Sequence, residues 1–320
     1  MAKKMANMAI LEILTYYSDE QHPLSRDEIL NLLKANYHIE IGRKTFYEHI
    51  DALKKLKYDI SDFSTNRKGY YLLERSFEKS EINLLCHSIH SSHIIPARAS
   101  RDLIGKLLKT QSKHMQREFH HHVYGKNYRK TENPQFFLNI DIILEAVHNR
   151  NPISFIYTKY NLEKEKIPRR EQRYITNPYD IVYNNSCCYL IGYSEKRNDY
   201  THYRIDKMED IEMITEQKFI IKENFYAYDY AKTKTYMYGG KEYNVFIKCD
   251  ISILDDVLNT FGINTFIQKH TDNTFFAKIT TTKEGAIYWA LQYCKYCCII
   301  EPLEIKEEIK TILLKAIENY

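Results

Sequence analysis

The sequence lacks the motifs that mark the common enzyme classes and the long apolar runs of membrane proteins. Its 320 residues contain only nine glycines, and none belongs to a P-loop, a GxGxxG or a GxSxG motif. No histidine stands in an HExxH or triad context, and the carboxylates form no recognisable paired motif. Apolar windows long enough to span a bilayer are broken by Lys, Asp or Asn. We therefore expect neither an enzyme nor a membrane protein.

The seven cysteines do not suggest a disulfide framework. Their number is odd, and the adjacent pairs Cys187–Cys188 and Cys297–Cys298 are awkward to bridge. Cys294 and Cys297 have CxxC spacing, but a structural zinc site needs a second ligand pair and no second CxxC occurs. We expect small buried hydrophobic residues instead. Since the N-terminus has a charged helical pattern rather than that of a signal peptide, the sequence predicts a cytoplasmic protein with no metal or other cofactor.

Positive charge is concentrated locally. The net charge is only +4, and residues 1–75 carry 12 Lys and Arg against 11 Asp and Glu. Residues 98–130 carry 9 against 2, which suits the steering of a polyanion to one face rather than nonspecific binding over the whole surface. The histidine run at 120–122 lies in this segment. Consecutive helical residues point in different directions, so we expect a polar linker there and no metal site.

The first 55 residues show the pattern of three short helices. One is expected over residues 5–17, and Ser25 with Glu28 makes the capping box of a second. A third is expected to begin near Arg43. Apolar residues at helical spacing supply its buried face: Phe46, Ile50 and Leu53.

A hairpin is expected after the third helix. Two β-prone runs flank residues 65–69, which place Arg67 and Lys68 at a basic tip. Three helices followed by a hairpin is the order of a winged helix-turn-helix. The spacing from Thr45 through Ile50 to Leu53 also resembles that of DeoR-like winged helices.

The winged helix pattern predicts DNA binding. The exposed start of the third helix can enter the major groove, and the basic tip suits phosphates or the minor groove. One such helix alone would indicate only a solvated face, but the capping box, helix and basic tip together favour a DNA reader. The expected contacts are Arg43, Lys44, Thr45, Tyr47, Arg67 and Lys68.

The middle of the chain holds an arginine inside a tyrosine-rich strand. Residues 153–160 alternate like a strand, and residues 177–193 and 202–208 read as further strands around a turn. A buried arginine is costly without a partner. Arg204 is therefore expected either to pair with an acid such as Asp206, which shares its strand face, or to bind an anionic ligand.

This segment resembles the WYL domain, the ligand-sensing module of many bacterial transcription regulators. Cys188-Tyr189-Leu190 stands where the family has Trp-Tyr-Leu, and Arg204–Met208 stands where it has Arg-(Val/Leu)-Asp-Arg-(Ile/Met). Cys188 replaces the family's tryptophan and Lys207 its second arginine. The resemblance implies a small Sm-like barrel, related to SH3 folds, that binds an anionic nucleotide or oligonucleotide.

The resemblance also implies where that ligand is bound. An arginine can make a bidentate contact to phosphate, and tyrosine rings can stack on bases. A family arginine that usually precedes the signature proline is offset by one position here, at Arg173. His202 would share the strand face of Arg204. The candidate ligand contacts are Tyr157, Tyr189, His202, Arg204, Lys207 and Arg173.

The C-terminal part resembles the extension that follows the WYL domain in the family. Strands are expected at residues 244–250, 275–280 and 298–302, with helices between them and after them. This βαββαβ-like order suggests a ferredoxin-like fold.

Together these patterns predict a multidomain α+β protein. Its parts would be a winged helix-turn-helix (1–75), a helical linker (76–135), a WYL barrel (136–225) and a C-terminal extension (226–320). We expect a homodimeric transcription regulator that binds a palindromic double-stranded operator and senses a nucleotide or single-stranded oligonucleotide. A nucleic-acid-processing enzyme, which would show turnover, stays open. So does a scaffold, which would not bind duplex DNA even at low salt.

Overall fold

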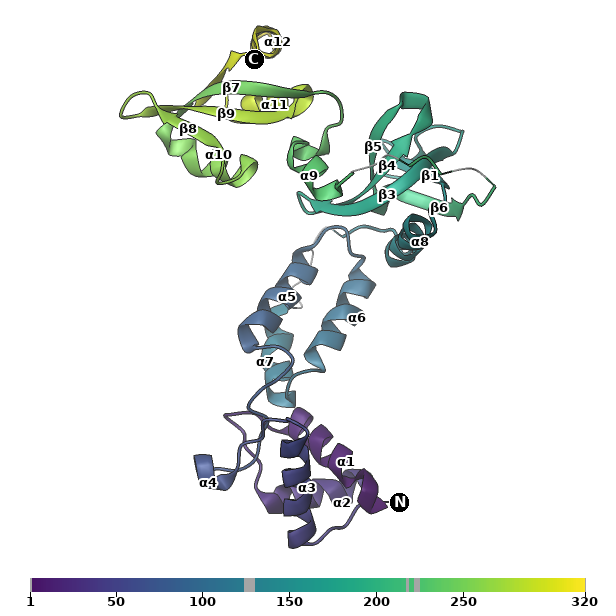
Figure 1. Cartoon of the computed structure of the whole chain (residues 1–320), viewed down its shortest axis with the longest axis vertical. Helices are drawn as coiled ribbons and strands as arrows, with labels where there is room; N and C mark the ends of the chain where they lie inside the picture. Colours follow the sequence, from purple (N-terminus) through teal and green to yellow (C-terminus); the bar gives the residue numbers. More distant parts are fainter. Residues whose placement is uncertain (1, 124–129, 217–218, 222–224, 320) are drawn as a thin grey trace. The chain divides into compact units, whose positions relative to one another are not determined.

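The chain folds into two compact units, Met1–Glu132 and Asn133–Tyr320. The computed structural model describes residues 2–123, 130–216, 219–221 and 225–319, except for the side chains of residues 2–4, 65 and 120–123 (Figure 1). Among the described helices, none is both long and apolar enough to cross a bilayer.

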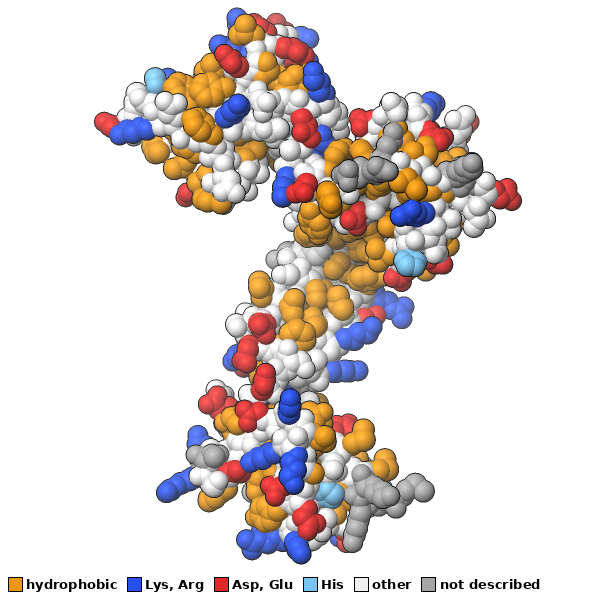
Figure 2. Space-filling view, viewed as in Figure 1, with side chains coloured by type: hydrophobic (Ala, Val, Ile, Leu, Met, Phe, Trp, Pro, Cys, Tyr) orange, Lys and Arg blue, Asp and Glu red, His pale blue; other side chains and the backbone are white. Residues whose placement is uncertain are grey.

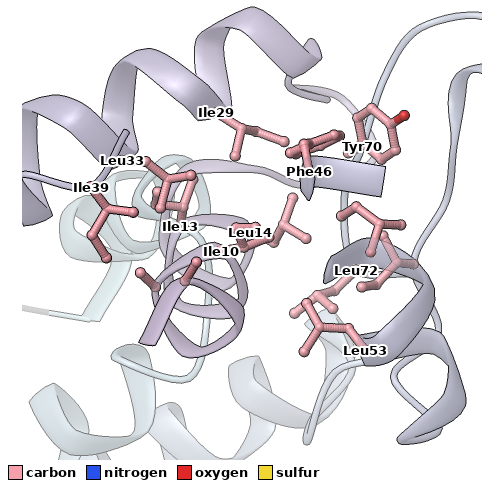
Figure 3. Packing of buried hydrophobic residues seen from close by; sticks show 14 residues of the cluster. Ile10, Ile13, Leu14, Ile29, Leu33, Ile39, Phe46, Leu53, Tyr70 and Leu72 are labelled. Atoms are coloured by element: carbon pink, nitrogen blue, oxygen red, sulfur yellow. The ribbon is translucent and has the colours of Figure 1, made fainter. Parts of the chain in front are cut away.

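Three helices open the first unit: α1 (Ala2–Tyr17), α2 (Arg26–Tyr37) and α3 (Arg43–Lys55). The predicted capping box is present, since the Ser25 hydroxyl accepts from the Glu28 backbone N–H at 3.3 Å and the Glu28 carboxylate accepts from the Ser25 N–H at 2.8 Å. The three helices share one apolar core, whose side chains point toward one another in Figure 3. It contains the predicted buried face of α3, namely Phe46, Ile50 and Leu53.

The segment after α3 departs from the predicted hairpin. The two runs are joined by an isolated bridge between Ile60 and Leu72, a second bridge pairs Tyr70 with Leu24 before α2, and a short helix, α4 (Phe63–Asn66), occupies the tip. Local side-chain hydrogen bonds explain this. The Asn66 side chain accepts from the Lys68 and Gly69 N–H groups at 2.7 and 2.9 Å and donates to the Gly69 carbonyl at 2.8 Å, replacing ladder bonds.

Gly69 fixes how this segment returns to the helices. Its φ is +156°, and a Cβ there would lie 2.4 Å from the Leu24 carbonyl oxygen. Only glycine fits so close an approach of two backbones. The chain can therefore pair Tyr70 with Leu24 and bring the tip back beside α2.

Helices also dominate residues 79–123, as predicted, with α5 (Lys79–Ser91), α6 (Ala97–Leu108) and α7 (Lys113–Val123). Ile82, Cys86 and Ile104 form the centre of their core. Arg75 ties these helices to α1, because its guanidinium donates to the carbonyl oxygens of Thr15, Ser18 and Thr110.

The second unit begins with α8 (Phe136–Asn149) and a curled antiparallel sheet. The strand order is β2-β1-β3-β4-β5, and β6 also pairs with β1 in antiparallel register. Asn133 and Asn139 donate to backbone carbonyls of Asp206 and Met208 and so anchor α8 to the sheet. The strands are β1 (Ile153–Tyr160), β2 (Lys166–Pro168), β3 (Tyr174–Asn184), β4 (Cys187–Ser194), β5 (Asp199–Arg204) and β6 (Met208–Met213).

After α9 (Ala227–Lys232), a four-stranded antiparallel sheet has the order β10-β7-β9-β8. The predicted strands correspond to β7 (Glu242–Asp250), β9 (Thr274–Thr282) and β10 (Cys297–Glu301), and β8 (Phe266–Lys269) is an additional short strand. Three helices accompany them: α10 (Leu254–Phe261), α11 (Lys283–Gln292) and α12 (Leu303–Ile317). The single tryptophan, Trp289, is 1% exposed at the centre of this core.

Candidate functional site

The start of α3 presents the predicted DNA-contact residues to solvent. Arg43, Lys44 and Tyr47 are exposed, and Thr45 is half-buried. The Arg43 guanidinium lies 5.8 Å from the centre of the Tyr47 ring, and its hydrogen bond lowers the pKa of the Tyr47 phenol. The helix start is thus a small aromatic and basic surface.

Arg26 is a further basic residue at this surface that the sequence did not single out. It is the first residue of α2, and it bonds to Asp27 as well as to the Tyr47 phenol. Its position directly after the Ser25 cap is the sequence feature that could have indicated it. Because a helix N-terminus tolerates acids better than bases, Arg26 there is an unusual choice for stability alone.

The tip around α4 also exposes its cations. Arg67 and Lys68 are exposed, and Arg67 adopts a left-handed conformation with φ of 52°. Basic and acidic side chains are interspersed over this end of the first unit in the view of Figure 2. Nearby acids pair with other lysines, as in Lys54 with Asp62 and Lys34 with Glu40. Among the described residues, no ion pair involves the four cationic residues of the predicted DNA contacts, which are Arg43, Lys44, Arg67 and Lys68.

In the curled sheet, the Arg204 guanidinium meets the buried Asp206 carboxylate. Nε and Nη2 of Arg204 donate to Oδ1 and Oδ2 of Asp206 at 3.1 and 2.8 Å. The Arg204 side chain is 33% exposed and that of Asp206 is 9% exposed. This bidentate bond raises the pKa of Arg204. Of the two roles left open for Arg204, the ion pair is therefore present in the structure.

Three more predicted residues surround this ion pair. The Tyr157 hydroxyl accepts from the Arg204 backbone N–H at 3.2 Å, and Tyr189 lies directly opposite Arg204 on β4. Lys207 is half-buried, and burial followed by the nearby Arg204 lowers its pKa. Arg169, which was not predicted, lies 5.5 Å from the centre of the Tyr157 ring. We call Tyr157, Arg169, Tyr189, Arg204, Asp206 and Lys207 the Arg204 patch.

His202, two residues before Arg204 on β5, bonds to groups outside the Arg204 patch. Its Nδ1 lies 2.9 Å from the Met237 carbonyl oxygen and its Nε2 lies 3.0 Å from the Tyr230 hydroxyl. Burial lowers the pKa of the imidazole. Both ring nitrogens are therefore occupied by groups that follow the curled sheet, which explains the residue as a structural contact.

Arg173 also lies apart from Arg204. Its guanidinium donates to the Ser154 hydroxyl at 3.1 Å and forms ion pairs with Asp210 and, at 3.5 Å, Glu212. Its side chain is 31% exposed, and it lines a cavity of about 510 Å³ near the start of β3 and the end of β4. The six residues predicted for the ligand are thus divided among three places.

This cavity, which we call the basic cavity, is lined by four cationic side chains and one carboxylate. The cations are Arg170, Arg173, Lys196 and Arg197, and the carboxylate is Glu195. Tyr174 and Tyr203 supply aromatic walls. Its volume lies within the range of small-molecule sites, roughly 300–1,000 Å³.

The orientation of Arg170 gives the basic cavity a stacked aromatic edge. Its guanidinium lies 3.6 Å from the centre of the Tyr174 ring and donates to the Gln172 and Arg173 carbonyl oxygens. Lys196 and Arg197 are exposed on the short helical turn after β4. Only one sequence signal marks these residues, namely basic doublets in the loops that flank β3 and β4.

The basic cavity and the Arg204 patch are separate but share an aromatic core. Tyr189 and Ser194 lie near opposite ends of β4, about 17 Å apart at the rise of an antiparallel strand. The rings of Tyr157 and Tyr174 are 5.7 Å apart, and Tyr203 packs against both at 5.5 and 5.8 Å. The two sites are therefore joined by packed rings inside the curled sheet.

No candidate metal centre accompanies these sites. In the part of the chain that the structure describes, no three His, Cys, Asp or Glu side chains come together as a metal-binding group. The side chains of the histidine run at 120–122 lie outside the described residues.

Comparisons with known proteins identify the middle of the chain. Residues 139–213 match the family model described as the WYL domain, and no curated protein matches the chain. Among solved structures, proteasome accessory factor B/C (PafBC) of Arthrobacter aurescens is similar, with 14% identity and a TM-score of 0.30 over 98% of this chain and 48% of that one. The chain thus spans about half the length of that relative.

A second similar structure is described as a CRISPR Cas-related protein, with 15% identity and a TM-score of 0.39 over 78% of this chain and 75% of that one. Both structural likenesses are distant. The match of the family model covers α8 from Asn139 onward and all six strands of the curled sheet, and it confirms the resemblance read from the signature residues. The middle of the chain, residues 139–213, therefore contains a WYL domain.

Proposed function

We propose that the chain is a DNA-binding transcription regulator, without catalytic activity, whose WYL domain responds to an anionic nucleotide or oligonucleotide. One observation carries the DNA-binding part. Within the described part of the chain, the exposed cations at the start of α3 and at the α4 tip lack acidic partners, whereas Lys34 of α2 and Lys54 of α3 are paired. Unpaired surface cations bind a polyanion without first losing an ion pair, and they release condensed counterions from DNA.

The elements support a winged helix-turn-helix for this role. The capped α2, the turn at residues 38–42 and α3 would form the helix-turn-helix, and the α4 segment would form the wing. At 13 residues, α3 is about 20 Å long, and a major groove about 12 Å wide admits such a helix. Arg43 and Lys44 would then meet the duplex first.

We also propose fold classes for the two sheets of the second unit. The curled sheet would be an Sm-like barrel. The order β10-β7-β9-β8, with α10 and α11 between the strands, is that expected of a ferredoxin-like domain. We further propose a cytoplasmic homodimer on a two-fold operator, because symmetric dimers match palindromic sites.

Among the described residues, the basic cavity offers an anionic effector more unpaired cations than the Arg204 patch does. Lys196 and Arg197 are exposed and their charges outnumber the single carboxylate of Glu195, whereas Arg204 already holds Asp206. A phosphate in the basic cavity would gain cations while breaking few ion pairs. An oligonucleotide could extend from there toward Arg169 and Lys207 of the Arg204 patch.

Selection of bound duplexes from a random pool, with and without short single-stranded oligonucleotides, tests the proposed function. We expect enrichment of a two-fold symmetric sequence, and a changed yield of bound duplex when the effector is present. Failure to retain any duplex at low salt would favour a scaffold, and turnover of the nucleic acid would favour an enzyme.

A further inference from the structure

Two cysteines face each other across neighbouring strands of the C-terminal sheet. Cys249 of β7 and Cys297 of β10 are direct partners in the antiparallel register. Opposed Cα atoms in such a pair lie about 4.5–5.5 Å apart, which falls inside the range of about 4.4–6.8 Å that a disulfide spans. The spacing of the two backbones is therefore compatible with a disulfide.

The two thiols also point to the same side of the sheet. Side chains of directly opposed residues share a face, and the next pair on that face, Ile247 and Ile299, is buried in the core. Cys249 is 0% exposed and hydrogen-bonds to the half-buried Cys297 thiol. Both cysteines are free thiols.

We propose that Cys249 and Cys297 are a site of reversible oxidation, at which a peroxide converts the two thiols into a cross-strand disulfide. This modification is independent of the proposed DNA and effector sites. It would link β10, and the α12 that follows it, covalently to the central strand β7.

The chemistry proceeds in two displacements. The Cys297 thiolate attacks one peroxide oxygen, an S–O bond forms, the O–O bond breaks, and the leaving hydroxide takes a proton to become water. The Cys249 sulfur then attacks the sulfenic sulfur, an S–S bond forms and the S–O bond breaks, and the leaving hydroxide takes the proton of the Cys249 thiol to become a second water. Two thiols lose two electrons in total, and one peroxide is reduced to two waters.

The surroundings assign the two roles. The hydrogen bond with Cys249 lowers the pKa of Cys297, while that bond and burial raise the pKa of Cys249. Cys297 is also the more accessible of the two. Since the thiolate is the nucleophile, Cys297 reacts first and Cys249 resolves the sulfenic acid from beside it.

The same segment supplies a competitor and a matched control. Cys294 is exposed and stands in CxxC spacing with Cys297, but it lies in the turn before β10 and so is not paired across the sheet. Cys298 is exposed and is opposed by Lys248 on the other face of the sheet. Cys298 therefore lies beside Cys297 on β10 and is accessible to peroxide, but it has no thiol opposite it.

Peptide mapping by mass spectrometry tests the site on the full-length protein. After hydrogen peroxide treatment of the folded protein and alkylation in denaturant without reductant, we expect Cys249 and Cys297 to resist alkylation together, in one disulfide-linked peptide pair that dithiothreitol separates. Alkylation of both in full, or a disulfide between Cys297 and Cys294, would overturn the proposal.

Three variants separate the oxidation of Cys297 from the formation of the disulfide. Cys297→Ser should leave Cys249 fully alkylatable after peroxide, and Cys249→Ser should stop Cys297 at a sulfenic acid that dimedone traps. Cys298→Ser should form the same linked pair as the native protein. Loss of the linked pair in Cys298→Ser would contradict the assignment. Because the decisive readout is the linked peptide of the native chain, poor folding of a variant does not leave the proposal untested.

Discussion

The cations at the start of α3 and two arginines of the curled sheet, Arg173 and Arg204, are in opposite electrostatic situations. Arg43 and Lys44 are exposed and lack acidic partners within the described residues. Arg204 and Arg173 are held by Asp206 and Asp210. In the first arrangement, a polyanion can bind without displacing a carboxylate. In the second, an anion must compete with a carboxylate, which suits a site that supports the fold or responds conditionally.

The largest expected effect concerns the Arg204 ion pair. Asp206→Asn leaves the guanidinium without its carboxylate, so we expect a loss of about 2 kcal/mol in the free energy of unfolding, measured by urea denaturation. Asp210→Asn is the matched control, because Asp210 is 59% exposed and exposed pairs contribute only about 0–1 kcal/mol. Equal losses in the two variants would show that burial does not distinguish the two arginines.

The second effect concerns the unpaired cations of α3. Arg43→Ala with Lys44→Ala should weaken binding to a selected duplex about thirtyfold, ~2 kcal/mol. The slope of log affinity against log salt should fall by about 2, because two side chains no longer neutralise phosphates. Lys34→Ala, which removes a cation already paired with Glu40, should change little. An equal effect of Lys34→Ala would break the distinction between paired and unpaired cations.

The third effect concerns the basic cavity. Lys196→Ala with Arg197→Ala should weaken binding of a mononucleotide about tenfold, ~1.4 kcal/mol, in isothermal titration calorimetry. Lys159→Ala is the control, since this exposed lysine of β1 does not line the basic cavity. If Arg204→Ala abolished binding while the double variant kept it, the effector site would be the Arg204 patch.

The smallest effect is a pH dependence from His202. Burial lowers its pKa in the folded protein, so the unfolded state takes up a proton more readily. Stability from this group is complete above the ordinary histidine pKa of about 6.5 and falls as the pH drops below it. Urea denaturation across this range should show a shallower dependence on pH in His202→Phe than in the native chain. If the free energy of unfolding of His202→Phe depended on pH as steeply as that of the native chain, His202 would not be the source of the pH dependence.

Local patterns predicted most of the helices and the middle domain. The Ser25–Glu28 capping box and the spacing of Phe46, Ile50 and Leu53 act within one to three helical turns. They therefore depend little on distant parts of the chain. The WYL resemblance came from the signature around Tyr189 and Arg204, and the family match confirms it.

Features that depend on distant segments could not be predicted in the same way. The basic cavity joins Arg170 to Lys196 and Arg197 through the pairing of β3 with β4, and no local pattern specifies that pairing. The opposition of Cys249 and Cys297 depends on the strand register. At the α4 tip, the local hydrogen bonds of Asn66 outweigh the β-propensity of the sequence.

Duplex binding in the presence of an effector is the most direct measurement of the central claim. Fluorescence anisotropy would follow the full-length chain on a selected duplex, with and without a short single-stranded oligonucleotide. We predict that the oligonucleotide changes the duplex affinity of the native chain, and that Lys196→Ala with Arg197→Ala removes this response while keeping duplex binding. A native chain that binds no duplex at low salt, or whose affinity no oligonucleotide changes, would contradict the assignment of a ligand-responsive DNA reader.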